Sequence, residues 1–345
     1  MYFHNLLSDG NYLIKKARIT LVAFDSLGDS LIYLMIAENL RINDYEVTFY
    51  SGLIHQMQEW VPQLKVRPYP PVKQFDKEFD QYDFVIMSPP SFIRAKMDES
   101  VLHEMRQKWA LVCQKAPTSW FFNQRDRLLN QLPGEVLDNL QNLLFCGGSI
   151  RSGKQLGLNV VEMALEYMKE RMHLSSLSRQ VLISPPTGLQ HRRYRKRIVI
   201  SPDSAGPEKK NWSPRRFLRL CHKLTEMGYE PNIVVAPKNY QTWKNMKGNV
   251  FSTPLFPNIG QLAAFIYESG ALVANDSGNG HLASFLNVPV VTIYRKRNAN
   301  FYWRPSWGPG VVICPKLRLP WFGGAVWKPF VKTSEIISAL DKLVK

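Results

Sequence analysis

A turn of small residues between an apolar strand and a helix is the segment of this chain best suited to chemistry. The strand predicted over 271–276 ends at an Asn-Asp pair, the turn Ser277-Gly278-Asn279-Gly280 follows, and a helix is expected to begin near His281. Glycines let a backbone approach a ligand closely, and the first N–H groups of a helix have no partner within it. These groups and the helix dipole favour an anion such as a phosphate. The alternative is an ordinary tight turn in which Asp276 caps the helix.

A lysine beside a loop of small residues is the second candidate. Lys210 lies in ISPDSAGPEKKNWSPRRF, just before a helix that Ser213 and Pro214 are expected to open. A lysine held at such an entrance is suited to a phosphate, and Ser201 and Ser204 would add hydroxyl donors. The alternative for Lys210 is a solvated surface lysine.

A carboxylate after the first predicted strand is the third candidate. The strand over 17–24 runs into DSLGD, which contains Asp25, Gly28 and Asp29. A positioned carboxylate acts as a general base on a hydroxyl, an effect of about 10²–10⁴-fold, and Gly28 would allow a substrate close approach. Asp25 competes with Asp29 for this role, and Asp29 alternatively caps the helix that follows.

These candidates lie at the ends of strands that alternate with helices, which predicts parallel-sheet α/β domains. With 345 residues the chain suits two domains: 1–180, a linker over 181–196 with paired prolines and a basic run, and 197–345. The predicted strands span 17–24, 46–51, 82–88, 197–202, 231–237, 271–276 and 289–294. The stretch between the third strand and about residue 177 has a mostly helical pattern.

The formal net charge of +16 lies entirely in the C-terminal half, which has 24 Lys and Arg against 8 Asp and Glu. Such a field gathers anions, either a nucleotide diphosphate, a membrane surface or nucleic acid, although solvated surface charge is the simpler alternative. No run of about 18 apolar residues predicts a membrane span, and the N-terminus does not resemble a signal peptide. The four cysteines match no metal-binding spacing.

Two other classes fit the sequence less well. A nucleic-acid-binding protein would account for the charge, but no helix-turn-helix, zinc or RNP-like motif accompanies it. A dinucleotide oxidoreductase would need Gly-x-Gly-x-x-Gly after its first strand, where FDSLGDS has a single glycine.

The three candidate segments together resemble glycosyltransferase family 9, the ADP-heptose:lipopolysaccharide heptosyltransferases. That family carries an Asp-Ser/Thr-Gly-x-x-His-Leu-Ala turn and then a Val-Pro-Val-Val strand, which match Asp276–Ala283 and Val288–Val291. Lys210 and Trp212 fall on its Lys-x-Trp, and Asp29 falls on the acid of its N-terminal Gly-Asp. The resemblance is closest over 197–310.

The resemblance implies the GT-B fold, in which two Rossmann-like parallel-sheet domains face each other across a cleft. It implies an N-terminal acceptor domain, a C-terminal donor domain, and an inverting, metal-independent transfer with Asp29 as catalytic base. The residues expected to hold the donor are Lys210, Ser201, Ser204, Asp276, Ser277, Gly278, Asn279, Gly280 and His281. Those expected near the acceptor or in a loop near the donor are Gly28, Asp25, Arg295 and Arg297.

The sequence departs from the family's pattern at several positions. The family places an acid that holds the ribose after the strand that corresponds to 231–237, where this chain has Lys238 and Asn239. Asn279 replaces the usual leucine of the turn, and Ser213 separates Trp212 from the proline. These departures leave the base of the nucleotide open and favour a divergent member.

The expected function is transfer of a sugar, heptose in the family, from ADP-heptose to a lipopolysaccharide-core or related glycan in the bacterial cytoplasm. No cofactor is expected beyond the nucleotide-sugar co-substrate. The basic run over 191–197 would rest on the anionic inner membrane or form an exposed linker. A GT-B-shaped sugar-nucleotide epimerase, or a sugar-nucleotide binder without catalysis, stays open as the alternative.

Overall fold

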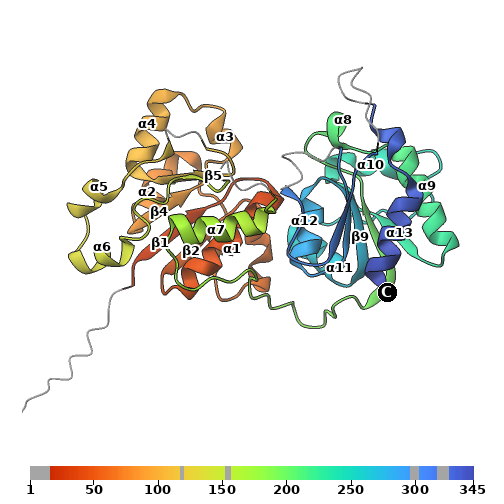
Figure 1. Cartoon of the computed structure of the whole chain (residues 1–345), viewed down its shortest axis with the longest axis horizontal. Coiled ribbons are helices and arrows are strands. Elements are labelled where there is room, and N and C mark those ends of the chain that lie inside the picture. Colours follow the sequence, from red (N-terminus) through yellow and green to blue (C-terminus); the bar gives the residue numbers. More distant parts are fainter. Residues whose placement is uncertain (1–15, 117–119, 152–156, 296–302, 317–325) are drawn as a thin grey trace, which may run out of the picture.

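Two α/β lobes lie side by side in the computed structural model, which describes residues 16–116, 120–151, 157–295, 303–316 and 326–345 (Figure 1). The N-terminal lobe contains a six-stranded sheet of order β3-β2-β1-β4-β5-β6. The C-terminal lobe contains a five-stranded sheet of order β11-β10-β9-β7-β8. Every strand pair in both sheets is parallel, which confirms the predicted fold class.

The N-terminal lobe follows the alternation of strand and helix that its sequence predicts. Its strands are β1 (Arg18–Val22), β2 (Glu46–Tyr50), β3 (Lys65–Arg67), β4 (Phe84–Met87), β5 (Ala110–Cys113) and β6 (Gly148–Ser149). Its α-helices are α1 (Leu27–Ile42), α2 (Phe75–Phe79), α3 (Ser91–Arg94), α4 (Glu99–Lys108), α5 (Arg125–Leu129), α6 (Gly134–Leu140) and α7 (Val160–Arg171). Two 3₁₀ helices, η1 (Ile54–Trp60) and η2 (Val72–Gln74), follow β2 and β3.

The C-terminal lobe repeats the same plan. Its strands are β7 (Tyr194–Ser201), β8 (Glu230–Ile233), β9 (Ser269–Asn275), β10 (Val290–Ile293) and β11 (Gly310–Ile313). Its α-helices are α8 (Pro207–Lys210), α9 (Pro214–Glu226), α10 (Tyr240–Lys244), α11 (Ile259–Tyr267), α12 (Gly278–Phe285) and α13 (Thr333–Val344), with 3₁₀ helices η4 (Pro237–Asn239) and η7 (Lys328–Phe330). The central strand β9 is buried along its whole length, as expected of a strand covered on both faces.

Several elements differ from the sequence prediction. Strands β3, β5, β6 and β11 were not predicted, because each has only two to four residues and shows no clear period. Strand β7 begins at Tyr194, inside the predicted linker, where Arg197 stacks on the Tyr194 ring at 4.3 Å. Helices α1 and α12 begin at Leu27 and Gly278, about one turn earlier than expected, because the small and polar residues before their apolar stretches already form their first turns.

The order of each sheet reverses at one position. In the N-terminal lobe this switch lies between β1 and β4, and in the C-terminal lobe it lies between β7 and β9. Open parallel sheets bind ligands at the carboxyl ends of the strands beside such a switch. The loops after β1, β7 and β9, which contain the three candidate segments, all begin there.

The lobes contact each other through two pairs of helices. Helix α1 packs against α12, and η1 packs against α11. One cluster of buried apolar side chains runs from the N-terminal lobe into the C-terminal lobe and includes Leu31 of α1 and Leu282 of α12. None of the helices within the described ranges is both long and apolar enough to cross a membrane.

Candidate functional site

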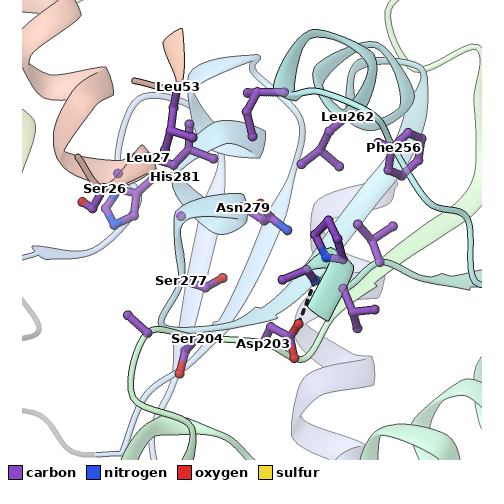
Figure 2. A pocket seen from close by; sticks show the side chains of 18 of the residues that line it. Ser26, Leu27, Leu53, Asp203, Ser204, Phe256, Leu262, Ser277, Asn279 and His281 are labelled. Atoms are coloured by element: carbon purple, nitrogen blue, oxygen red, sulfur yellow. Dashed lines mark hydrogen bonds between the residues drawn. The ribbon is translucent and has the colours of Figure 1, made fainter. Parts of the chain in front are cut away.

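A cavity of about 670 Å³ lies between the carboxyl ends of the two sheets. The N-terminal lobe contributes the loop after β1 and the start of α1 to its wall, together with Leu53 and Gln56. The C-terminal lobe contributes the loops after β7, β8 and β9, the 256–259 segment, Leu262 and Trp303. Figure 2 shows Ser26, Leu27 and His281 close together at one side of this space and Phe256 and Leu262 at the other. A cavity of this size suits a small-molecule ligand.

Asp29 enters the cavity from the first turn of α1. The helix is capped by Ser26, whose hydroxyl accepts a hydrogen bond from the Asp29 N–H at 3.3 Å, so the predicted alternative in which Asp29 caps the helix does not occur. The same hydroxyl donates to the Asp29 carboxylate. Burial raises the pKa of Asp29 above its ordinary value, and the Ser26 hydrogen bond and the charge of Arg94 partly offset this. A carboxylate with a raised pKa is a better proton acceptor than an exposed aspartate.

Asp25 does not line the cavity and instead holds another helix. Its carboxylate accepts hydrogen bonds from the backbone N–H of Ser91, at 3.1 Å, and from the Ser91 hydroxyl. Helix α3, which begins at Ser91, is thereby tied to the loop after β1. Of the two competing carboxylates, only Asp29 lines the cavity.

Lys210 stands at the opposite wall and forms an ion pair with Asp276. The Lys210 Nζ lies 2.8 Å from the Asp276 Oδ2, and both side chains are partly exposed in the cavity. The Asp276 carboxylate therefore pairs with Lys210 and does not cap the start of α12. The predicted alternative, in which Asp276 is a helix cap, is wrong.

Asn275, the last residue of β9, fixes the loop that carries Lys210. Its side-chain oxygen accepts from the backbone N–H of Trp212 at 3.0 Å, and its Nδ2 donates to the carbonyl of Pro202. The indole of Trp212 is buried and donates to the Lys328 carbonyl at 3.0 Å. These bonds explain how the residues around the Lys-x-Trp sequence are held next to the end of β9.

The first turn of α12 opens into the cavity. Ser277 precedes the helix with extended backbone, and no side chain caps the N–H groups of its first turn. The Ser277 hydroxyl has no hydrogen-bond partner among the described residues. Asn279 also lines the cavity and donates to the Ser201 hydroxyl at 2.9 Å. Unpartnered N–H groups and a hydroxyl beside Lys210 form a site suited to a phosphate.

His281 forms part of the contact between the lobes. Its ring is buried against Gly28, where an added Cβ would lie 3.0 Å from the His281 Cδ2. Burial lowers the pKa of His281 to about 4, so the imidazole is neutral at pH 7. Gly28 is needed at this position because helices α1 and α12 approach each other so closely.

Some predicted residues lie outside the cavity wall. Ser201 is buried and accepts a hydrogen bond from Asn279, and Gly280 is a buried residue within the first turn of α12. Neither of them, nor Asp25 or Arg295, lines the cavity. Arg297 lies outside the described residues. The cavity-lining residues that the sequence did predict are Asp29, Gly28, Ser204, Lys210, Asp276, Ser277, Gly278, Asn279 and His281.

Asp203 lines the cavity and was not predicted. It follows β7 and binds the segment after β8, which supplies an apolar slot together with Phe256 and Leu262. The sequence contains a signal for this residue, because Asp203 directly precedes Ser204 in the small-residue loop. Among the described residues, no group of three or more His, Cys, Asp and Glu side chains could hold a metal ion.

Comparison with known families matches residues 79–318 to the model of glycosyltransferase family 9 (heptosyltransferase). This match spans more than half of the chain. The chain belongs to glycosyltransferase family 9. It is therefore a glycosyltransferase, as the resemblance of its motifs implied. A search of curated protein sequences returned no match.

Solved structures of family 9 enzymes share the fold at low sequence identity. A family 9 glycosyltransferase from Veillonella parvula is 17% identical with a TM-score of 0.65, and covers 96% of this chain and 98% of its own. ADP-heptose lps heptosyltransferase II of E. coli is 15% identical with a TM-score of 0.59, covering 95% and 98%. E. coli heptosyltransferase WaaC with ADP is 14% identical with a TM-score of 0.59, covering 94% and 99%. These similarities support the two-domain GT-B arrangement.

Proposed function

We propose that this family 9 glycosyltransferase transfers a heptosyl group from ADP-heptose to a lipopolysaccharide-core or related glycan acceptor, with inversion. The observation that carries the proposal is the cavity between the lobes, which is lined by Asp29 from one side and by Lys210 and the start of α12 from the other. Related structures support the donor, since structures of E. coli WaaC contain ADP and ADP-2-deoxy-2-fluoro heptose.

In the proposed reaction, Asp29 removes the proton of an acceptor hydroxyl while that oxygen attacks the anomeric carbon of the donor sugar. The bond between this carbon and the donor's phosphate oxygen breaks, and the electron pair leaves with the nucleoside diphosphate. Attack from the side opposite the leaving group inverts the anomeric centre. Burial of Asp29 favours proton uptake, because it raises the pKa of the carboxylate.

The leaving diphosphate gains negative charge as the bond breaks, and the C-terminal lobe offers groups that stabilise it. Lys210 and the N–H groups of the first turn of α12 lie together at the cavity wall. Groups already oriented toward developing charge stabilise a transition state without further reorganisation. Packing of the two lobes around the cavity would also limit access of water to the donor.

The proposal predicts different effects for the two walls of the cavity. Asp29→Ala should lower kcat by about 10²–10⁴-fold and leave the Kd of ADP nearly unchanged, because the carboxylate acts on the acceptor. Lys210→Ala should weaken ADP binding by roughly 10-fold or more, because it removes a charge partner of the diphosphate. Transfer from ADP-heptose to heptose-deficient lipopolysaccharide and calorimetric binding of ADP measure the two effects.

An equal loss of ADP affinity in both variants would contradict this division of roles. Calorimetry with UDP, GDP and CDP beside ADP identifies the base, and a lack of binding by all four would exclude the donor site.

Two further predictions concern location and cofactors. We expect the protein in the cytoplasm, with the basic run over 191–197 in peripheral contact with the inner membrane. We also expect transfer to be independent of cofactors.

A further inference from the structure

A carboxylate in the cavity is held by an adjacent loop. Asp203 follows β7, but its Oδ2 accepts hydrogen bonds from the backbone N–H of Ala236, at 2.8 Å, and from Nδ2 of Asn239, at 3.0 Å. Both donors follow the neighbouring strand β8. The acid of one strand end is therefore fixed beside the end of the next strand, where it lines the cavity, and Figure 2 shows its side chain with a hydrogen bond drawn as a dashed line.

The other oxygen of Asp203 is available to a ligand. No residue of the described chain donates a hydrogen bond to Oδ1, and no cation pairs with the carboxylate, whereas Asp276 has Lys210. Because two donors hold Oδ2, the orientation of the carboxylate is set before a ligand binds, which lowers the entropy cost of binding. Such an acceptor attracts hydroxyl or N–H groups.

The position of Asp203 indicates which part of a nucleotide sugar it contacts. Its negative charge disfavours the diphosphate, which Lys210 and the start of α12 attract. It lies instead beside the slot of Val234, Pro237 and Phe256, whose apolar surfaces suit a planar base. The ribose connects base and diphosphate, so its hydroxyls are the donors expected between the two.

An acid at the end of a neighbouring strand is the usual ribose partner in nucleotide-binding α/β folds. In this chain no Asp or Glu occurs between Glu230 and Glu268, so the segment after β8 has no acid of its own. Asp203 reaches that place from β7 instead, and Asn239 is one of the two groups that orient it.

We propose that Oδ1 of Asp203 accepts a hydrogen bond from a ribose hydroxyl of the nucleotide-sugar donor. The proposal rests on the proposed function, because it assigns the nucleoside end of the same donor site. It makes Asp203 a residue that distinguishes ribonucleotides from nucleotides without these hydroxyls.

The test uses Asp203→Asn, which keeps the shape of the side chain. The Asn oxygen can still accept from Ala236 and Asn239, so the loop remains tied, but an NH₂ donor replaces Oδ1. Asp341→Asn is the matched control, since Asp341 lies on α13 away from the cavity and accepts a hydrogen bond from the Tyr229 hydroxyl. Thermal unfolding midpoints of all three proteins verify that the folds are intact.

Calorimetry should compare ADP, GDP, UDP and CDP, each beside its 2′,3′-dideoxy counterpart. For the diphosphate that binds best, we expect the full-length wild type to prefer the ribose form by roughly 10- to 100-fold, as for a hydrogen bond to a charged group. Asp203→Asn should lose most of this preference by weakening only the ribose form. Asp341→Asn should retain it.

Two outcomes would overturn the inference while the proposed function stands. One is a wild type that binds the ribose and dideoxy forms equally. The other is an Asp203→Asn variant that weakens both forms to the same extent, which would show that Asp203 only holds the loop. If none of the four diphosphates bound the wild type, the assignment of this cavity as a donor site would be wrong. The inference on Asp203 would then be wrong as well.

Discussion

At the scale of single residues, the site depends on side chains that hold one another. Ser26 both caps α1 and donates to the carboxylate of Asp29, so one hydroxyl fixes the helix start and the proposed base. Lys210 has a partner in Asp276, and Asp203 has two donors in the loop after β8. Each functional group therefore has a defined position within the protein.

Ser26→Ala should move the acidic limb of the pH–rate profile to higher pH. The hydroxyl stabilises the ionised carboxylate and lowers the pKa of Asp29 against the effect of burial, so its removal raises that pKa further. A base with a higher pKa is protonated, and thus inactive, up to a higher pH. Measurement of kcat/KM from pH 4 to 8 tests this.

Ser26→Thr is the control, because it keeps a hydroxyl and a capping side chain. It should leave the acidic limb near its wild-type position. A Ser26→Ala limb that stayed in place or moved to lower pH would show that the titrating group is not Asp29.

The sequence predicted many of these residues, for reasons that are local. The turn at 276–281 and Lys210 were recognisable because glycines, a helix start and a lysine occur within a few positions. Asp203 was missed because its place depends on Ala236, 33 residues further on. Ser201 was assigned to the ligand because the sequence does not show that a strand residue points into the core.

At the scale of elements, two helix starts meet at the cavity, and glycines allow their close approach. An added Cβ on Gly28 would lie 3.0 Å from the His281 ring, and one on Gly278 would lie 2.8 Å from the Cβ of Leu27. Helix α1 was predicted to begin later, since its first turn consists of residues that also occur in loops. The structure instead places Asp29 on a helix, where its backbone is fixed.

Gly28→Ala should lower both stability and activity. Alanine normally stabilises a helix by up to about 1 kcal/mol relative to glycine, but here the methyl group presses on a buried ring, a strain of about 1–3 kcal/mol. A displaced α1 also moves Asp29, and a misplacement of about 1 Å costs on the order of 10²-fold in rate. Thermal unfolding and kcat measure the two losses.

Gly134→Ala is the matched control, because Gly134 begins α6 with no atom within 4 Å of an added Cβ. It should be neutral or slightly stabilising. The loss of stability caused by Gly28→Ala should shrink in a His281→Ala background, since the contact then disappears. Equal losses in both backgrounds would mean that the ring is not the cause.

At the scale of the whole molecule, the fold could be predicted because each lobe repeats a regular alternation of strand and helix. The contact between the lobes could not be predicted, because it joins residues about 200 positions apart. On the side of η1, the backbone N–H of Ile259 donates to Oε1 of Gln56 at 2.8 Å. An added Cβ on Gly260 would lie only 2.4 Å from the Gln56 carbonyl oxygen.

Gly260→Ala should therefore change how the lobes meet. A backbone-to-backbone approach of this kind leaves no flexible side chain to move, so η1 and α11 have to separate. We expect kcat for transfer to fall by roughly 10- to 100-fold, because Asp29 and Lys210 come from different lobes, while the Kd of ADP changes little. Gly134→Ala again serves as the control.

Small-angle scattering of Gly260→Ala should show a slightly larger radius of gyration than the wild type. If kcat and the scattering profile were both unchanged, the lobes would not need this contact in solution. If ADP affinity fell as much as kcat, the substitution would have damaged the C-terminal lobe itself.

The ion pair between Lys210 and Asp276 also bears on how the enzyme begins its next cycle. In the proposed reaction, the nucleoside diphosphate that remains after transfer shares Lys210 with the carboxylate of Asp276. That carboxylate weakens the hold on a spent nucleotide, and it likewise disfavours capture of stray cellular anions. We therefore expect Asp276 to lower the affinity of the site for the nucleotide product and to speed its release.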